Sequence, residues 1–225
     1  MTMAITLLNA IAIQDKDITA DALLTQRKLA HDLVEDRQPH YHFTAQGNQP
    51  TLQQDIADCF QDRREPDFIE YTPPDHGRIE TRQIRTTTAL NTYLDFPHIA
   101  QAFVIERECL YKKSGKRSLE IAYGITRRPP EEASAQRLLQ INRDHWSIEN
   151  SCHSILDWTF DEDRCRISKG YGPEHITRLR RFAISLIKLK GVRSVPQKMR
   201  ELNWNTRLVF DYLRMTKNAC VATAA

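Results

Sequence analysis

The order of short strand and helix patterns over residues 18–62 is the feature that most constrains the fold. A helix pattern over 2–11 precedes a strand over 18–21, a helix over 23–35, a strand over 41–45 and a helix over 51–62. Successive strands joined by a helix run parallel, because the helical crossover returns the chain to the same end of the sheet. Residues 1–65 therefore predict an α/β fold with a parallel strand pair.

Residues 66–128 change to a β pattern. Alternating β-forming and charged residues predict three antiparallel strands, over 78–86, 102–108 and 119–125. We therefore expect an antiparallel β segment inserted between the α/β part and the C-terminal third of the chain.

The spacing becomes helical after Pro129 and Pro130, over 131–157, 174–190 and 197–215. In the second of these helices an apolar stripe is predicted to face the core, formed by Leu179, Phe182, Ala183, Leu186 and Ile187.

Composition excludes several classes of protein. The 7 glycines form neither a GxGxxG nor a GxxxxGK[ST] motif, so a glycine-rich phosphate loop is not expected. No apolar run approaches the roughly 20 residues of a membrane span, and no secretory leader is recognised. The 5 cysteines form no CxxC pair, which predicts neither a zinc knuckle nor a disulfide framework, and a reducing cytoplasm as the compartment.

Charge is distributed unevenly along the chain. Residues 164–225 contain 14 Lys and Arg against 3 acids, whereas residues 1–163 contain 18 Lys and Arg against 26 acids. A basic segment of this density suits a polyanion, and nucleic acid is the first candidate. A solvated helix face, or a surface that complements the acidic part, accounts for the same charges.

The segment Arg143–His153 reads RDHWSIENSCH and lies in a predicted helix. His145, Glu149 and His153 recur every four residues and would share one helix face, with Asn142 on the same side. A glutamate flanked by histidines one turn away on each side could hold a divalent metal. An ordinary polar face with i,i+4 hydrogen bonds fits the same spacing.

Asp21 ends the first predicted strand. A carboxylate at the carboxyl end of a parallel strand occupies the usual functional edge of an open α/β sheet. Asp is also a common helix N-cap, and Ala22 begins a helical pattern. Both roles are open for Asp21, and capping is the commoner one.

Six segments of the chain resemble the H-repeat-associated branch of the DDE-type insertion-sequence transposases. Asp21–Ala30 (DALLTQRKLA) is similar to the segment with the family's second aspartate, and His145–Asn150 (HWSIEN) to its glutamate signature. The other similar segments are His42–Pro50, His76–Arg82, Leu156–Asp163 and Leu179–Ala183. The resemblance implies an incomplete ribonuclease-H-like catalytic core over 1–65, an inserted antiparallel β segment over 66–128, and a helical part over 129–225 with the glutamate motif and a basic tail.

The resemblance also implies a chemistry. DDE transposases cut and join DNA by in-line phosphoryl transfer at two Mg²⁺ or Mn²⁺ ions held by three carboxylates. Asp21 would be the second of these carboxylates and Glu149 the third, as catalytic and metal-binding residues. Residues expected to contact the scissile phosphate or to orient Glu149 are Arg143, His145, Asn150 and His153. Residues expected to contact the backbone of the DNA partner, the transposon ends, are Arg166, Lys169, Arg178 and Arg181.

The chain departs from the family at the first catalytic aspartate. In the family this residue lies in an Asp-Gly-Lys segment of the first core strand, and no such tripeptide occurs in the chain. Asp17 does not replace it, since a strand places Asp17 about 13 Å from Asp21, whereas the ions of a two-metal site lie about 3.5–4 Å apart. Gln46 stands where family members often carry Lys. The chain is therefore expected to be an N-terminally truncated transposase that is inactive alone.

Truncation has a further consequence and leaves other functions open. Without the first core strand, residues 17–21 would form an open apolar sheet edge, which favours aggregation, dimerisation or association with a full-length transposase. The alternative function is a non-catalytic DNA-binding or regulatory module that associates with full-length transposase. A gene remnant without activity is the third hypothesis.

Overall fold

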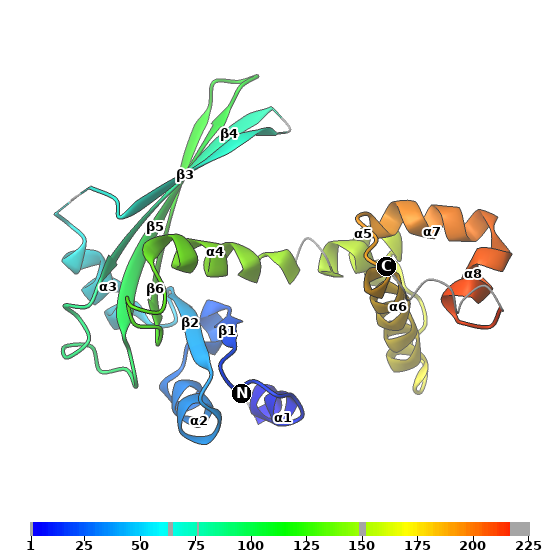
Figure 1. The fold of residues 1–225 in the computed structure, drawn as a ribbon, viewed down its shortest axis with the longest axis horizontal. Helices are drawn as coiled ribbons and strands as arrows, with labels where there is room; N and C mark the ends of the chain where they lie inside the picture. Colours follow the sequence, from blue (N-terminus) through cyan, green and yellow to red (C-terminus); the bar gives the residue numbers. More distant parts are fainter. Residues whose placement is uncertain (1, 63–64, 76, 149–151, 217–225) are drawn as a thin grey trace. The chain divides into compact units, whose positions relative to one another are not determined.

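The structure is a computed structural model that describes residues 2–62, 65–75, 77–148 and 152–216, in two compact units (Figure 1). The sheet unit ends at His145, and the helical unit begins at Trp146. In chain order the elements of the sheet unit are α1 (Thr2–Asn9), β1 (Asp17–Ala20), the 3₁₀ helix η1 (Ala22–Leu24), α2 (Arg27–Arg37), β2 (His40–Ala45), α3 (Pro50–Cys59), β3 (Phe68–Asp75), β4 (Arg78–Thr87), β5 (Gln101–Tyr111), β6 (Arg117–Thr126) and α4 (Ala135–His145).

The strands of the sheet unit form one mixed sheet in the order β1-β2-β6-β5-β4-β3. β1 and β2 pair in parallel, from Asp17 opposite His40 to Ala20 opposite Phe43, and η1 and α2 connect them. This confirms the parallel pair predicted from the strand–helix–strand order. The other neighbours are antiparallel, and the pairing of β2 with β6 joins the β segment of residues 66–128 to the same sheet. That segment has four strands instead of three, because β3 adds to those predicted.

Helices cover both faces of the sheet, since successive side chains of a strand point to opposite faces. On β5, Ala102 and Val104 belong to the core beneath α2 and α3, whereas Phe103 and Ile105 pack beneath α4. The first core also contains Leu29, Leu33, Tyr41, Phe43, Leu52, Ile56 and Ile125, and the second Ile84, Leu138, Leu139 and Ile141. Figure 1 shows α4 crossing the strands of the sheet.

The helical unit has a small core of its own, formed by Ile155, Leu156, Ile184, Ile187 and Val195. Its elements are α5 (Ser154–Thr159), the 3₁₀ helix η3 (Glu162–Arg164), α6 (Gly172–Leu189), α7 (Val195–Trp204) and α8 (Thr206–Tyr212). Among the described residues, no helix combines the length and the apolar character that crossing a membrane requires.

Three helix predictions differ from the structure. The helix predicted over 197–215 is two helices, α7 and α8, because Asn205 ends the first and caps the second. α4 ends at His145 instead of continuing without a break to Asp157, since Trp146 forms a turn before helical structure resumes at Ser147. The predicted stripe of α6 is wrong at Leu179 and Phe182, which are 62% and 57% exposed. The core of the helical unit uses the neighbouring face of α6, where Ile184 and Ile187 are buried.

Candidate active site

Asp21 lies at the carboxyl end of β1, the usual ligand-binding edge of an open α/β sheet. Its backbone is extended, with φ −63° and ψ 157°, and its side chain is exposed. Oδ1 of Asp21 accepts a hydrogen bond of 2.7 Å from the backbone N of Ala22 and so caps η1. The capping role expected for Asp21 is confirmed. A carboxylate has about four lone-pair sites, so capping uses only part of its binding capacity.

Asp17, at the start of β1, is held by two arginines. Its Oδ1 accepts a hydrogen bond of 2.5 Å from Arg128 Nε, and its Oδ2 one of 2.9 Å from Arg137 Nη2 on α4. The Asp17 side chain is only 16% exposed, so solvent screens these pairs weakly. Asp17 therefore ties α4 to β1, and two guanidinium groups already match its charge.

The last turn of α4 is tied to the same strand. His145 Nδ1 lies 3.1 Å from the hydroxyl oxygen Oγ1 of Thr19, and the contact is partly buried. Asp17, Thr19 and Asp21 occupy every second position of an extended segment, which places them toward one face. The contact therefore brings the helix that leads toward Glu149 beside the strand that leads into Asp21.

His42 lies on β2 opposite Thr19 and is 3% exposed. Its ring stacks on Phe103 with 4.5 Å between centroids, and neither ring nitrogen has a hydrogen-bond partner among the described residues. Burial lowers the pKa of His42 to about 3, although nearby Asp17 raises it. His42 is therefore neutral at pH 7 and adds no positive charge beside Thr19 and Asp17.

Arg143 of α4 points to β3 at the opposite edge of the sheet. Its Nη1 lies 2.5 Å from Oε1 of Glu70. In this structure Arg143 is therefore paired within the protein, away from β1.

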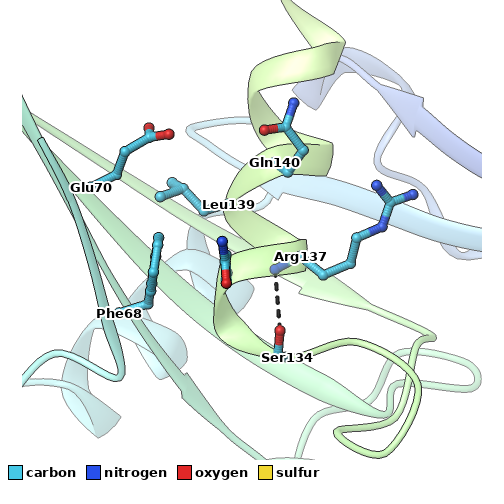
Figure 2. A pocket seen from close by; sticks show the side chains of 7 residues that line it. Phe68, Glu70, Ser134, Arg137, Leu139 and Gln140 are labelled. Carbon is cyan, nitrogen blue, oxygen red and sulfur yellow. Dashed lines mark hydrogen bonds between the residues drawn. The ribbon is translucent and has the colours of Figure 1, made fainter. Parts of the chain in front are cut away.

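A cavity of about 290 Å³ lies beside that pair, between β3 and the first turns of α4 (Figure 2). Figure 2 shows Leu139 pointing toward Phe68 and Glu70. The lining residues are Phe68, Glu70, Ser134, Gln136, Arg137, Leu139 and Gln140. Its charged groups are engaged elsewhere, Glu70 with Arg143 and Arg137 with Asp17. The cavity therefore offers no carboxylate that could join Asp21.

Two residues of the predicted glutamate motif, Glu149 and Asn150, lie outside the described residues. His153 belongs to the helical unit, immediately before α5, and is exposed. Among the described residues of this motif, His145 contacts the strand of Asp21.

The four predicted DNA-contacting residues are all exposed on the helical unit. Arg166 and Lys169 lie between η3 and α6. Arg178 and Arg181 lie on α6, less than one turn apart, and Arg178 pairs with Glu174 at 2.5 Å. These cations belong to one unit and are accessible to solvent.

The described ranges contain no group of three or more His, Cys, Asp or Glu side chains that could hold a metal ion. At the carboxyl end of β1 they contribute Asp21, whose exposed carboxylate offers the hard oxygen ligand that Mg²⁺ prefers. One carboxylate does not make a metal site, so any complete site requires ligands beyond the described residues.

Thr19, Arg128 and Arg137 were not among the residues predicted for this region. Thr19 had a sequence signal, since it alternates with Asp17 and Asp21 along the strand. The two arginines had none, because they lie 111 and 120 positions from Asp17 in the chain.

Comparison with known proteins identifies the family. The profile described as “Transposase DDE domain” matches residues 1–184, most of the chain. The chain belongs to the DDE transposase family. This match, together with the similarity to an H repeat-associated putative transposase, confirms the predicted resemblance.

Three relatives from Escherichia coli show how much of the family the chain covers. “Putative transposase YncI” of strain O157:H7 is 26% identical over 222 residues, which are 92% of this chain and 55% of the relative. “H repeat-associated putative transposase YhhI” and “Putative protein YbfL” of strain K12 are each 27% identical over 195 residues, 80% of this chain and 50% of the relative. The chain thus spans about half the length of these relatives.

Proposed function

We propose that the chain is part of the catalytic core of a DDE transposase, with Asp21 and Glu149 as two of three metal-binding carboxylates. The observation that carries this proposal is the 3.1 Å contact between His145 Nδ1 and Thr19 Oγ1. Thr19 precedes Asp21 by two residues, and His145 precedes Glu149 by four. The contact therefore brings the residue four positions before Glu149 beside the strand that leads into Asp21.

The proposed core is ribonuclease-H-like and incomplete. Residues 1–65 carry the second aspartate, 66–128 form an insertion, and 129–225 supply the glutamate and the basic tail. Support comes from the parallel pair of β1 and β2 and from the helix α4, whose last turn contacts β1.

The residues of the proposed site have different tasks. Asp21 and Glu149 would hold Mg²⁺ or Mn²⁺, whose charge activates the attacking oxygen and stabilises the leaving oxygen of a phosphoryl transfer. His145, beside β1, would contact the scissile phosphate or orient Glu149, together with Asn150 and His153. Arg143 would do the same only after exchanging its bond to Glu70 for one to DNA.

The chain alone is proposed to be inactive. The nearest further carboxylate of β1, Asp17, is bonded to Arg128 and Arg137. Releasing it would remove a close partner from both Arg128 and Arg137, although Arg128 would still pair with Glu132 at 3.4 Å, and this loss is unfavourable. The third carboxylate would therefore be a residue other than Asp17.

Metal binding tests the carboxylate assignment directly. We expect the purified chain to bind Mn²⁺, measured by titration calorimetry or electron paramagnetic resonance. Asp21→Asn and Glu149→Gln should each weaken binding roughly tenfold or more, whereas Glu131→Gln, which changes an exposed carboxylate elsewhere, should not. Unchanged Mn²⁺ affinity in both site variants would contradict the proposal. Nicking of a supercoiled plasmid by the chain alone would contradict the inactivity.

A non-catalytic DNA-binding or regulatory module is the second candidate. The exposed cations of the helical unit favour it, since Arg178 is 76% exposed and Arg166, Lys169 and Arg181 are exposed as well. Each lost phosphate contact lowers the slope of log K against log salt by about 1.

Duplex DNA binding measured at several salt concentrations tests this candidate. Arg178→Ala and Arg181→Ala should each weaken binding and lower the salt slope, whereas Lys113→Ala, at an exposed turn of the sheet unit, should not. Two results together would favour the non-catalytic module: the Glu149→Gln variant still binds DNA, and the wild-type chain binds no Mn²⁺. If both variants bind DNA with the affinity and the salt slope of wild type, α6 is not the DNA-binding surface.

Association with a second copy or with a full-length transposase is also proposed, through β1. The backbone N of His40 donates to Lys16 O at 2.9 Å, so alternate residues from Lys16 onward bond to β2 while Asp17 and Thr19 direct their backbone groups to the open edge. Sedimentation should show association that rises with concentration. A monomer that melts sharply would contradict this.

A further inference from the structure

The buried apolar stripe of α4 stops one turn before the helix ends. Leu138, Leu139 and Ile141 are 0%, 2% and 3% exposed. The last four residues of the helix, 142–145, are half-buried or exposed. Apolar burial therefore anchors the first turns of α4, and polar contacts must position its last turn.

Two of the polar contacts between that last turn and the sheet differ in stiffness. Arg143 bonds to Glu70 on β3, but the two side chains are 39% and 26% exposed and both are long and flexible. Such a pair constrains position weakly. His145 bonds to Thr19 on β1, and the short, β-branched threonine side chain has one stiff rotatable bond before its hydroxyl. The contact with β1 is therefore the tighter constraint.

Thr19 is itself fixed by the sheet. Its neighbours Ile18 and Ala20 pack against the core beneath α2, on the face away from α4. In the parallel register of β1 with β2, Thr19 lies opposite His42, and the residues on either side of Thr19 bond to β2. The hydroxyl of Thr19 thus has a defined place between two anchored residues, two positions before Asp21.

We propose that Thr19 is a positioning residue, which holds His145 and through it sets the last turn of α4 relative to Asp21. This inference rests on the proposed function where it concerns metal binding. Where it concerns the position of the helix end, it rests on the contacts of the sheet unit alone. Thr19 orients the ring because its hydroxyl engages Nδ1, which turns the opposite nitrogen, Nε2, away from β1.

Paired substitutions of Thr19 test the inference. Thr19→Val keeps the shape of the side chain and removes the hydroxyl, whereas Thr19→Ser keeps the hydroxyl. We expect Thr19→Val to speed amide hydrogen exchange at residues 142–145 about five- to tenfold, with no change at Leu138 and Leu139, and to change the ¹⁵N spectrum of the His145 ring. Thr19→Ser should restore both, and Thr81→Val on β4 should leave both unchanged.

Substitutions of His145 keep the test valid if Thr19→Val does not fold. An asparagine places its amide where Nδ1 of histidine lies, whereas glutamine reaches the place of Nε2. His145→Asn should therefore preserve slow exchange at 142–144, and His145→Gln should not. Equal exchange in these two variants, or in wild type and Thr19→Val, would overturn the inference.

Mn²⁺ binding separates this inference from the proposed function. If wild type binds Mn²⁺, Thr19→Val should weaken binding severalfold and Thr19→Ser should restore it; an unchanged affinity overturns the effect on the metal site. If wild type binds no Mn²⁺, the proposed function fails, and hydrogen exchange and the His145 spectrum still decide whether Thr19 positions the helix.

Discussion

The sheet beneath α4 has an antiparallel side, β3 to β6, and a parallel side, β1 and β2, and they pair their charges differently. On the antiparallel side Glu80 is 5% exposed and bonds to Arg78, Arg82 and Arg107 at 2.5–2.9 Å, all from the same sheet. On the parallel side, Asp17 bonds to Arg137 of α4 and to Arg128.

This difference separates two uses of buried polar groups. The ion pairs of Glu80 join antiparallel strands to one another and stabilise them. The pair of Asp17 with Arg137 joins the start of β1 to the first turn of α4, and the contact of Thr19 with His145 joins the same strand to the last turn, so the parallel side fixes the position of α4 at both ends. Four changes to the chain test this contrast, from the largest expected effect to the smallest.

Glu80→Ala should destabilise the sheet unit most. Burial alone would raise the pKa of Glu80, but the hydrogen bond from Arg107 and the charge of Arg82 outweigh it and lower the pKa. Removing this carboxylate takes the most buried partner from three arginines and leaves Arg107 with the exposed Glu120, at a cost of about 4 kcal/mol in the free energy of unfolding. Glu120→Ala, whose side chain is 64% exposed, should cost less than about 1 kcal/mol. Equal losses in urea unfolding would show that the network does not act through burial.

Gly124→Ala tests the strand where the two sides meet, since β6 pairs with both β2 and β5. An added Cβ would lie 2.6 Å from the backbone O of Phe43 and still closer to the Phe103 ring. Because backbone cannot yield easily, we expect a loss of about 3 kcal/mol. Gly47→Ala has no atom within 4 Å of the new Cβ and should be nearly neutral. Thermal unfolding of both variants checks the contrast, and a neutral Gly124→Ala would contradict it.

His42→Phe should remove an acid sensitivity of the parallel side. The folded pKa of about 3 lies below the ordinary value of 6.5, so below pH 6.5 the unfolded chain binds a proton that the folded chain does not. Stability from His42 is therefore complete above that pH and falls progressively as the pH drops toward 3. Between pH 7 and pH 4.5 the loss is about 2–3 kcal/mol.

Urea unfolding at the two pH values measures this loss. Phenylalanine keeps the stacking on Phe103 and cannot ionise, so the variant should lose less stability in acid than wild type. An identical acid dependence in wild type and His42→Phe would assign the sensitivity to other groups.

Replacing Pro73 and Pro74 with threonine should have the smallest effect on stability, below about 0.5 kcal/mol. β3 is the edge strand of the antiparallel side, and its pairing register shifts between Thr72 and Asp75. Prolines at an edge lack the N–H that a further strand would use. The double variant should associate more strongly than wild type in light scattering. Unchanged association would mean that the prolines do not protect this edge.

The fold could be predicted where local pattern and tertiary environment agree. The parallel pair followed from the order of its elements, and the alternating residues of β4, β5 and β6 identified those strands. β3 was missed because Pro73 and Pro74 argue against a strand, although an edge position tolerates them. The inward face of α6 was misjudged because two neighbouring faces of that helix are apolar, and only packing with α5 and α7 selects one.

The candidate site was predictable only in part. Asp21 stood out through its place after a strand, and its capping role followed from the helix beyond it. The bond between Thr19 and His145 joins positions 126 apart, and no local pattern reports a tertiary contact of that kind. The bonds of Arg128 and Arg137 to Asp17 likewise join distant positions and have no local sequence signal.

The cap formed by Asp21 has a consequence for how strongly a cation could bind there. A free aspartate samples several rotamers and must give up that freedom when it coordinates an ion. The bond from Ala22 already restrains the side chain of Asp21, so much of this entropic loss occurs when the chain folds. An ion that binds Oδ1 of Asp21 would displace the hydrogen bond from Ala22 and loosen η1. An ion that binds Oδ2 would leave that hydrogen bond in place. Whether Ala22–Leu24 stay ordered when an ion binds would therefore report which oxygen the ion uses.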